Sequence, residues 1–502
     1  MIPATSRQYR ETLMPTNTYD LVVIGAGSGG IGAALAAARA GLRVLLVEKS
    51  DMLGGNATRC GVNCWEPGVG GTGIPFDIYN RMKRIPLAVG IYSSGRHFMW
   101  QRPDEAIPYP GGENLIDPAL GYADSLLRHP PRPMPRPELL EFRRLHNHGV
   151  PFEPEALAQV AGELLAETGR CIVLMNTACT GVVMRDRRIA EIKLADGRAV
   201  TASFYVDSTA NVLLAQACGC ETMLGQEGQA AFGEPHAPET PQDHLNGATL
   251  IYRVTPVESP GVEPLPPDIP DGCWWAPKFP VAAINHYPNG DLNVNMLPTM
   301  EGREALTMGY EAAYAECLRR VYAHWHHNQE SFPEFRGYRL NWIAPGLGER
   351  EGPRVVGRYV LTERDLLAGL SDQAHDDIIT IADHALDTHG KSTGRAGTSE
   401  FYQPYGVPYR CLLPRDADNL LVACRGASFT SLAASSCRLS RTMLQLGQAA
   451  GSAAFLALEL GVDLADVPPA RLRAFLREQH VQLDWPTPPD LLAYLRNEDQ
   501  EN

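Results

Sequence analysis

The sequence predicts an α/β fold, in which a Rossmann-like nucleotide-binding domain carries a small β-meander and an inserted α+β substrate domain. Residues 19–58 contain an apolar run, a glycine turn, an alanine-rich segment and a second apolar run, which is typical of a strand–helix–strand unit. Residues 180–206 contain three strand-like runs joined by tight turns, which predict the meander. Residues 224–342 combine alternating apolar stretches with a helical pattern, which favours a second unit.

The glycine turn has the spacing GxGxxG at Gly25, Gly27 and Gly30, directly after an apolar run. In such a motif the first glycine allows the tight turn, the second lets a pyrophosphate approach the backbone, and the third lets the helix pack closely on the sheet. The helix N-terminus then presents unpaired N–H groups to the phosphates. Glu48 ends the second apolar run and is expected to accept hydrogen bonds from a ribose diol.

The motif continues into Leu53-Gly54-Gly55, which resembles the LGG segment of the glutathione-reductase-like FAD superfamily. In that superfamily the loop after the ribose-binding acid runs along the pyrophosphate towards the flavin, so the resemblance implies FAD as the cofactor. The residues expected to bind FAD in this first unit are Gly25, Gly27, Gly30, Glu48, Lys49, Gly54, Gly55 and Thr58.

Two stretches without clear periodicity follow. Residues 59–75 are dense in glycine, which lets a backbone approach a flat ligand, so they are expected to form a loop along the isoalloxazine ring. Residues 76–150 alternate short helical pieces with proline-rich breaks and read as an insertion. Within it, residues 130–137 are expected to be extended and to lie on the surface.

The last strand of the predicted meander runs into DSTA at residues 207–210. The corresponding segment of the FAD superfamily reads DATG and returns the chain to the cofactor, whereas this sequence has Ala210 in place of the final glycine. The resemblance implies that Ser208 and Thr209 contact FAD. It also implies that the meander lies over the adenine, with Cys179 as a backbone contact.

Later motifs extend the resemblance over most of the chain. They are ERExxR at 349–354, YRCLLP at 409–414, NLLVACR at 419–425 and LGQAAGSAA at 446–454. Together with LGG they resemble the FAD-dependent oxidoreductase family that is widespread in bacteria, and they place Arg425 at the cofactor. The predicted division is a disordered tail at 1–18, a discontinuous FAD-binding domain at 19–75, 151–223 and 400–465, a proline-rich insertion at 76–150, a substrate domain at 224–399 and a helical tail at 466–502.

Arginines and a histidine after residue 345 are the candidates for substrate chemistry. Arg350 and Arg354 would share a face of a helix, where two guanidiniums could bind a carboxylate; a salt bridge that fixes the loop is the alternative. Asp387 and His389 lie two apart, which in a strand puts both on one side and suits either proton transfer or a structural pair. Arg410 is a weaker candidate.

Residues 431–460 are expected to form one final helix whose start, near 431–436, points its positive end at the pyrimidine edge of the flavin. Arg438 and Arg441 fall in its early part. For Arg441, a pair with a surface carboxylate is the favoured interpretation.

The leading hypothesis is an FAD-dependent enzyme that transfers a hydride to or from a small polar organic substrate. No second GxGxxG follows a strand, so the electron acceptor is unknown, with oxygen, a quinone or a carrier protein as options. One alternative is a thiol–disulfide oxidoreductase that uses Cys60 and Cys64. Disulfide reductases of the superfamily carry a redox cysteine pair at a similar place, but with four residues between the cysteines instead of three. The other is a protein in which FAD is structural.

Composition bounds the partners. The net charge of −14 without a basic run argues against nucleic acid as a partner, and no long apolar run predicts a membrane span. Eleven scattered cysteines favour a reducing cytoplasm. His324, His326 and His327 suggest a metal, but only the first and last share a helical face, so a solvated surface and no metal site are predicted. A homo-oligomer is compatible with the sequence.

Overall fold

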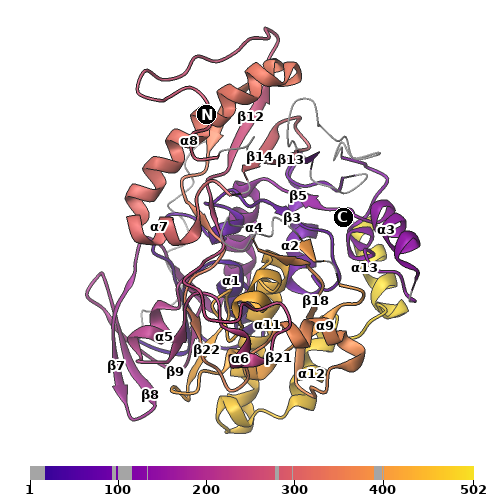
Figure 1. The fold of residues 1–502 in the computed structure, drawn as a ribbon. Coiled ribbons are helices and arrows are strands. Elements are labelled where there is room, and N and C mark those ends of the chain that lie inside the picture. Colours follow the sequence, from indigo (N-terminus) through magenta and orange to yellow (C-terminus); the bar gives the residue numbers. More distant parts are fainter. Residues whose placement is uncertain are drawn as a thin grey trace.

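The computed structural model describes residues 17–92, 98–99, 116–132, 134–276, 282–296, 298–388, 398–399 and 401–501. Figure 1 shows a lower α/β body and an upper part that contains α8 (Tyr310–Ser331). The predicted disordered tail lies outside the described residues except at its end, where β1 (Thr18–Ile24) begins.

A parallel sheet forms the centre of the lower body. Its strands run in the order β6-β2-β1-β9, and β22 pairs with β9 on the side away from β1. They are β1, β2 (Val44–Val47), β6 (Cys171–Leu174), β9 (Ala199–Asp207) and β22 (Leu420–Val422). In the register of the sheet Ile24 lies beside Val47 and Asp207, and Asp207 lies beside Val422. The segments that follow these strands therefore meet at one edge, where parallel α/β sheets bind ligands.

Two helices distant in sequence pack together over this sheet. They are α1 (Ser28–Arg39) and α11 (Ser440–Leu460), and both are largely buried. A Cβ built on Gly32 would lie 2.1 Å from Leu444 O, and one built on Gly447 would lie 1.9 Å from Gly29 O. Since neither glycine can carry a side chain, the two backbones are in direct contact. Chain segments about 400 residues apart thus form one rigid unit.

The predicted meander is present. It consists of β7 (Cys179–Arg185), β8 (Arg188–Leu194) and the first half of β9, paired antiparallel in that order. The second half of β9 leaves the meander and joins the parallel sheet through β1 and β22. One strand therefore fixes the meander relative to the nucleotide edge.

The upper part has its own antiparallel sheet and its own core. The strand order is β15 (Tyr338–Ile343), β12 (Tyr252–Pro256), β14 (Leu292–Met296), β13 (Ala282–His286) and β4 (Phe98–Met99). Buried apolar side chains such as Val294 and Trp325 pack between this sheet and α8. The helical pattern within residues 224–342 forms two consecutive helices, α7 (Gly302–Met308) and α8, because Gly309 between them has φ +80° and interrupts the helix.

Two further expectations need correction. The final helix is split into α10 (Ser431–Ser436) and α11, with non-helical residues between them. The stretch 130–137 is expected to be extended and on the surface, but Pro130 is buried, and the last two residues already belong to α3 (Arg136–Leu145). The domain limits given above stay predictions.

The other helices and strands are short and connect these units. They are η1 (Gly55–Ala57), β3 (Cys64–Trp65), α2 (Ile74–Met82), η2 (Tyr122–Leu126), β5 (Val150–Pro151), α4 (Pro154–Glu167), α5 (Leu213–Ala217), β10 (Thr222–Met223), α6 (Gln229–Phe232), β11 (Ala248–Thr249), η3 (Pro333–Gly337), β16 (Gly348–Glu349), β17 (Arg354–Val355), α9 (Glu363–Asp372), β18 (Ile378–Ala382), β19 (Leu386–Asp387), β20 (Thr398–Ser399), β21 (Tyr405–Pro408), η5 (Tyr409–Leu412), η6 (Leu464–Asp466), α12 (Pro469–Glu478) and α13 (Pro489–Glu501).

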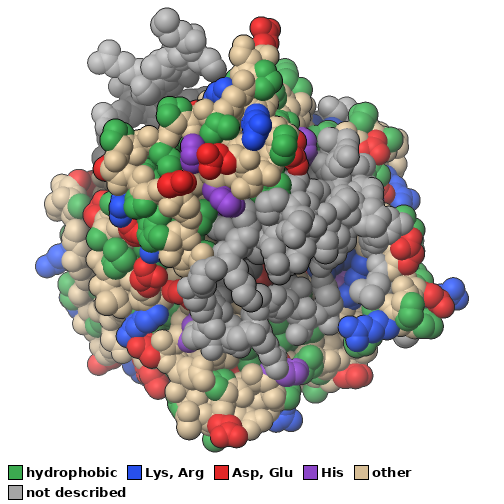
Figure 2. Space-filling view, turned by 45° about the horizontal axis from the view of Figure 1, so that its top comes forward, with side chains coloured by type: hydrophobic (Ala, Val, Ile, Leu, Met, Phe, Trp, Pro, Cys, Tyr) green, Lys and Arg blue, Asp and Glu red, His purple; other side chains and the backbone are tan. Residues whose placement is uncertain are grey.

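On the face drawn in Figure 2, acidic and basic side chains are interspersed without a broad area of one sign. Among the described helices, none combines the length and apolar character needed to cross a bilayer.

We predict that Gly447→Ala destabilises the protein, because its Cβ would overlap the backbone of α1. The expected loss is about 1–3 kcal/mol or more, measured as a lower apparent melting temperature. Gly162→Ala in α4 is the matched control: its Cβ would find only Leu53, at 3.7 Å, and a helical alanine gains about 0.5–1 kcal/mol over glycine. Equal melting temperatures for Gly447→Ala and the unmodified protein would contradict the contact.

Candidate functional site

The glycine turn joins β1 to α1 at the edge where the parallel strands end. Gly25 has φ +92°, and a Cβ there would lie 2.6 Å from Ser208 O. A Cβ on Gly30 would lie 1.9 Å from Gly25 O, so this glycine is required by the turn itself. Gly27 differs from both, because the nearest atom to its added Cβ is Ser208 O at 4.0 Å. The space in front of Gly27 is thus open to a ligand.

The N-terminus of α1 lies at this opening. Gly27 is its N-cap, no side chain caps it, and no acidic residue lies in its first turn. Its first N–H groups and the positive end of its dipole are therefore available to an anion, as a pyrophosphate site requires.

The LGG segment packs directly on the glycine turn. Gly54 N donates to Ala26 O at 2.8 Å, and a Cβ on Gly55 would lie 3.1 Å from Gly27 Cα. Thr58 donates its hydroxyl to Leu53 O at 2.6 Å and fills the space beside Gly54, so Thr58 holds the loop in shape. The LGG segment thus extends the open surface in front of Gly27.

Glu48 has the position expected of a ribose-binding carboxylate. Its side chain is buried at the end of β2 and accepts hydrogen bonds from Ala26 N (2.7 Å) and Ser50 N (2.8 Å). A carboxylate has about four lone-pair sites, so both oxygens can accept again. Lys49 beside it is exposed.

The end of β9 lies against the glycine turn. Ser208 donates its hydroxyl to Ala423 O at 3.2 Å, and Thr209 donates both its N–H and its hydroxyl to the buried carboxylate of Asp207. The hydroxyls of both residues are thus engaged within the protein, and their contacts to FAD stay predictions. Cys179 lies at the start of β7, where its thiol contacts Gly181 O at 3.6 Å.

Arg425 carries unused hydrogen-bond donors beside this turn. Its Nη2 donates to Asn211 Oδ1 (3.1 Å) and to Glu349 Oε2 (3.4 Å). In the described part of the chain, its buried Nε and Nη1 have no hydrogen-bond partner. Burial lowers the pKa of its guanidinium, while the nearby carboxylate of Glu349 raises it. Unpaired buried donors are costly, so an acceptor from a ligand fits here.

These groups fit a dinucleotide with a flavin. Glycine backbone for a pyrophosphate, a buried carboxylate for a ribose and an arginine with free donors lie around one opening. The individual contacts to FAD stay predictions.

The segment 346–354 lies over the nucleotide loop. Gly346 N donates to Arg59 O at 3.0 Å, and Asn56 Nδ2 donates to Glu349 O at 3.5 Å. This segment contains β16 and β17 and is not helical, so Arg350 and Arg354 do not share a helix face. It connects the upper antiparallel sheet with the nucleotide edge.

Arg354 is fully engaged by the protein. It donates to Glu351 (2.5 Å), Glu227 (2.6 Å), Gly225 O (2.7 Å) and Phe429 O (3.0 Å), and it is buried. These contacts favour the alternative in which this arginine fixes its surroundings.

Arg350 is in a different electrostatic environment. Its Nη1 donates to Gly247 O at 2.9 Å and to the hydroxyl of Thr249. Burial, with Arg438 as the next cause, lowers the pKa of Arg350 to about 9, and Asp387 opposes this. Asp387 itself accepts from Arg438 at 2.8 Å. Two guanidiniums and one carboxylate leave a net positive charge beside Arg350, which favours the binding of an anion there.

The predicted partner of Asp387, His389, lies outside the described residues. His384 is close to the same charges, and its buried Nδ1 has no hydrogen-bond partner among the described residues. Burial is the main cause that lowers the pKa of this imidazole. Its carbonyl accepts from Ser436, which also bonds Tyr405 at 2.6 Å. Sequence reasoning missed His384, although its place directly after a buried strand was a usable signal.

Arg410 is tied to a carboxylate. Its Nε donates to Asp377 Oδ2 at 2.9 Å, its guanidinium lies over the Tyr359 ring, and its side chain is 42% exposed. It stays a weaker prediction.

The glycine-rich loop is anchored on the start of α11. Gln445 accepts from Gly71 N at 3.1 Å and donates to Thr72 O at 3.2 Å. Arg441 donates to Ser125 Oγ at 2.9 Å and to Glu66 O. The expected surface pair of Arg441 is therefore wrong, because the side chain is buried and holds the loop.

The final helix is expected to point its positive end at the flavin, and either α10 or α11 could supply this N-terminus. In α10 the first N–H, that of Ser431, is taken by Glu227 at 2.8 Å. In α11 no side chain caps the N-terminus and no acidic residue lies in its first turn. The available positive end is thus that of α11, which begins at Ser440, after the expected start near 431–436.

Cys60 and Cys64 are free thiols; Cys60 is buried and Cys64 is half-buried. Burial raises the pKa of Cys60 to about 12 and that of Cys64 well above its usual value. A dithiol enzyme needs an accessible thiolate, so this environment disfavours the disulfide alternative.

The predicted solvated histidine surface also needs correction. His324 is completely buried, and its Nδ1 is 2.7 Å from the hydroxyl of Tyr252. His326 and His327 are half-buried.

Comparison with known proteins shows to which family the chain is similar. A family model described as FAD dependent oxidoreductase matches residues 20–476. The 4-oxocyclohexanecarboxylate 2-dehydrogenase of Sinomonas cyclohexanicum is 47% identical over 51 residues, which is 10% of this chain and 9% of that enzyme. Fumarate reductase (cytochrome) of Shewanella frigidimarina is 29% identical over 116 residues, 23% of this chain and 17% of that protein. The matched segments thus span only a small part of these relatives.

Among solved structures, a geranylgeranyl bacteriochlorophyll reductase-like protein from Thermoplasma acidophilum aligns over 97% of both chains, with a TM-score of 0.45 and 13% identity. L-proline dehydrogenase from P. horikoshii aligns over 92% of this chain and 98% of its own, with a TM-score of 0.39 and 12% identity.

We predict that Gly27→Ala weakens FAD binding at least tenfold, which is about 1.4 kcal/mol, and leaves the apoprotein as stable as before. The added Cβ meets no protein atom closer than 4.0 Å but fills the space in front of α1. Gly25→Ala is the contrast, because it overlaps Ser208 and should lower both stability and FAD content. Fluorescence titration of apoprotein with FAD measures the affinity. Unchanged affinity of Gly27→Ala would refute the pyrophosphate role of this glycine.

We predict that Cys60 resists alkylation in the native protein at pH 8. With a pKa of about 12, about one thiol in 10,000 is ionised at that pH. Iodoacetamide treatment followed by peptide mapping measures the labelling, and unfolded protein is the positive control. Rapid native labelling of Cys60 and Cys64 would revive the dithiol hypothesis.

Proposed function

This chain belongs to the FAD-dependent oxidoreductase family and takes FAD as its cofactor, and from this premise we propose that it transfers a hydride between the flavin and a small polar organic substrate that carries an anionic group. FAD supplies the two-electron chemistry. The protein supplies the binding, the orientation and the proton transfer.

The observation that carries the proposal is the cationic pair of Arg350 and Arg438 beside the nucleotide loop. The side chain of Arg350 is half-buried, and its pKa is lowered by burial and by the second guanidinium, while the carboxylate of Asp387 raises it. A bound carboxylate would remove that cost and gain charge-assisted hydrogen bonds. Arg350 follows directly on Glu349, whose carbonyl contacts Asn56 of the LGG loop. An anion at Arg350 would therefore lie close to the cofactor loop.

His384 is a second proposed proton acceptor beside His389, which stays a prediction. Its lowered pKa keeps the imidazole neutral near pH 7, and its Nδ1 has no partner among the described residues, so it can take a proton. Oxidation of an alcohol or amine carbon releases one hydride and one proton, and the latter needs such a base. Arg354 is a positioning residue in this proposal, since its donors hold the segment that carries Arg350.

The test of the function is anaerobic bleaching of the flavin spectrum. The FAD-loaded protein is mixed with hydroxy acids, amino acids, amines and neutral sugars, and absorbance of the oxidised flavin is followed. The proposal expects bleaching by an anionic compound. Bleaching by neutral sugars alone would refute the anionic substrate, and a flavin that reacts with no donor, and after photoreduction with no acceptor, would support the structural-FAD alternative.

We predict that Arg350→Ala raises the KM for the bleaching substrate about 10- to 150-fold, the equivalent of about 1.5–3 kcal/mol for a lost hydrogen bond to a charged group. Arg350→Lys should restore part of the affinity because it keeps the charge. Arg477→Ala, which removes an exposed arginine paired with Asp484, is the control and should leave KM unchanged. Stopped-flow reduction rates against substrate concentration give both constants. An Arg350→Ala variant with native KM would exclude this arginine from substrate binding.

A further inference from the structure

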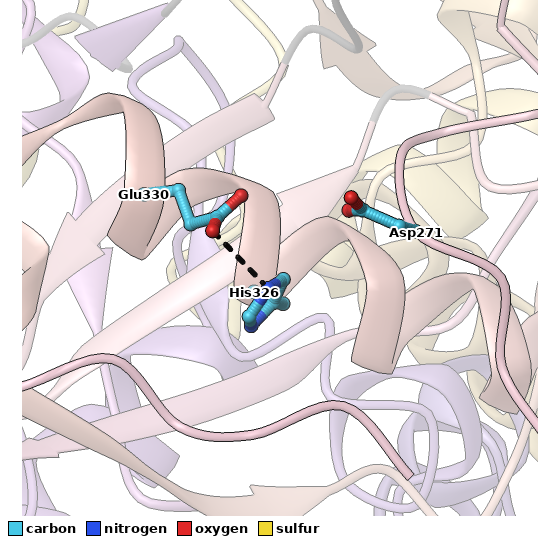
Figure 3. A group of neighbouring side chains, drawn as sticks. All are labelled: Asp271, His326 and Glu330. Atoms are coloured by element: carbon cyan, nitrogen blue, oxygen red, sulfur yellow. Dashed lines mark ion pairs between the residues drawn. The ribbon is translucent and has the colours of Figure 1, made fainter. Parts of the chain in front are cut away.

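We propose that the upper part binds a Zn²⁺-class divalent cation through Asp271, His326 and Glu330. One candidate ligand atom from each residue lies within 4.8 Å of the other two. Figure 3 shows the Asp271 carboxylate reaching from its loop toward the face of α8 that carries His326 and Glu330. This site is separate from the nucleotide edge and does not rest on the proposed reaction.

The orientation of His326 is that of a metal ligand. Its Nδ1 is 2.7 Å from Glu263 O, a backbone carbonyl, so Nδ1 must be the protonated nitrogen and donates this bond. The lone pair of Nε2 then points away from the carbonyl, toward Glu330 Oε1 at 3.5 Å. Metal-bound histidines are commonly fixed by such a bond from the other nitrogen to a carbonyl.

The spacing of the three residues suits one ion. His326 and Glu330 are four apart on α8, which places them one turn apart on a single face. In tetrahedral coordination at about 2.0–2.1 Å, ligand atoms stand about 3.4 Å apart. His326 Nε2 and Glu330 Oε1 already stand 3.5 Å apart, so only the Asp271 carboxylate must move inward, by about 1 Å, and this exposed side chain can do so by rotation.

The donor set selects the class of ion. One imidazole nitrogen and two carboxylates match Zn²⁺, whereas Ca²⁺ and Mg²⁺ prefer oxygen ligands alone. Glu263 is not among the three residues whose ligand atoms lie together, and its Oε2 accepts from Trp325 Nε1 and from Leu340 N. The remaining position is left to water.

The ion would join two segments that are far apart in sequence. Asp271 lies in the long connection between β12 and β13, which has no helix or strand among its described residues, and the other two ligands lie on α8. The site is therefore expected to hold this connection on the helix. No effect on the flavin is expected.

Equilibrium dialysis of the full-length, FAD-loaded protein against ZnCl₂ tests the proposal, with bound zinc counted per flavin. We expect one equivalent that is bound at micromolar or lower free zinc. His326→Ala and Asp271→Asn should each weaken this binding at least tenfold while flavin content stays native. Glu311→Gln, an exposed carboxylate at the start of α8, is the matched control and should bind like the unmodified protein.

Two further measurements make the outcome decisive. Zinc should raise the melting temperature of the unmodified protein and of Glu311→Gln, but not of His326→Ala. MgCl₂ at the same concentration should raise neither. Zinc binding that persists unchanged in both ligand variants would assign it to the cysteines and overturn the proposal, as would no binding by the unmodified protein.

Discussion

The direct backbone contact between α1 and α11 is the constraint on which the rest of the molecule depends. Gly32 and Gly447 leave no space for a side chain at this contact, so the distance between the two helices is set by backbone atoms. Backbone contact gives a fixed geometry because it involves no rotamers. The start of α1 faces the nucleotide edge, and the start of α11 holds the glycine-rich loop through Gln445 and Arg441. The cofactor surface and its covering loop are thus placed by one contact.

The segment 346–354 links the lower body to the upper part. It is hydrogen-bonded to the LGG loop at Arg59 and Asn56, and Arg354 within it donates to Phe429 O and Glu227. The charged pair of Arg350 and Arg438 therefore combines one residue from this segment with one that follows α10. A site made from separate chain segments requires each of them to be fixed independently, and the buried hydrogen bonds of Arg354 serve that end.

The sequence made the local parts of this arrangement predictable. Gly25, Gly27 and Glu48 belong to a strand–turn–helix–strand motif whose residues lie close together in sequence, so the motif can be recognised locally. The parallel sheet and the meander are predictable for the same reason. The break between α10 and α11 was not predictable, because the residues beside it are held by distant partners: Ser436 donates to His384 O and Arg438 to Asp387, each about 50 residues away in sequence. The same holds for His129, which directly precedes the stretch 130–137 that is predicted to lie on the surface, yet has its Nε2 3.0 Å from the buried Asp383. Asp271 and His326 also come together only through tertiary packing.

The separation of α1 from α11 along the chain has a consequence for biosynthesis. The ribosome makes the N-terminal strand–helix–strand unit first, and domains generally fold as they emerge. Here the glycine-lined face of α1 stays uncovered until α11, the last long helix of the sheet, has been synthesised. By then the whole upper part has left the ribosome. The contact that places the cofactor surface is therefore completed only late in synthesis, and until then the small-residue face of α1 has no partner helix.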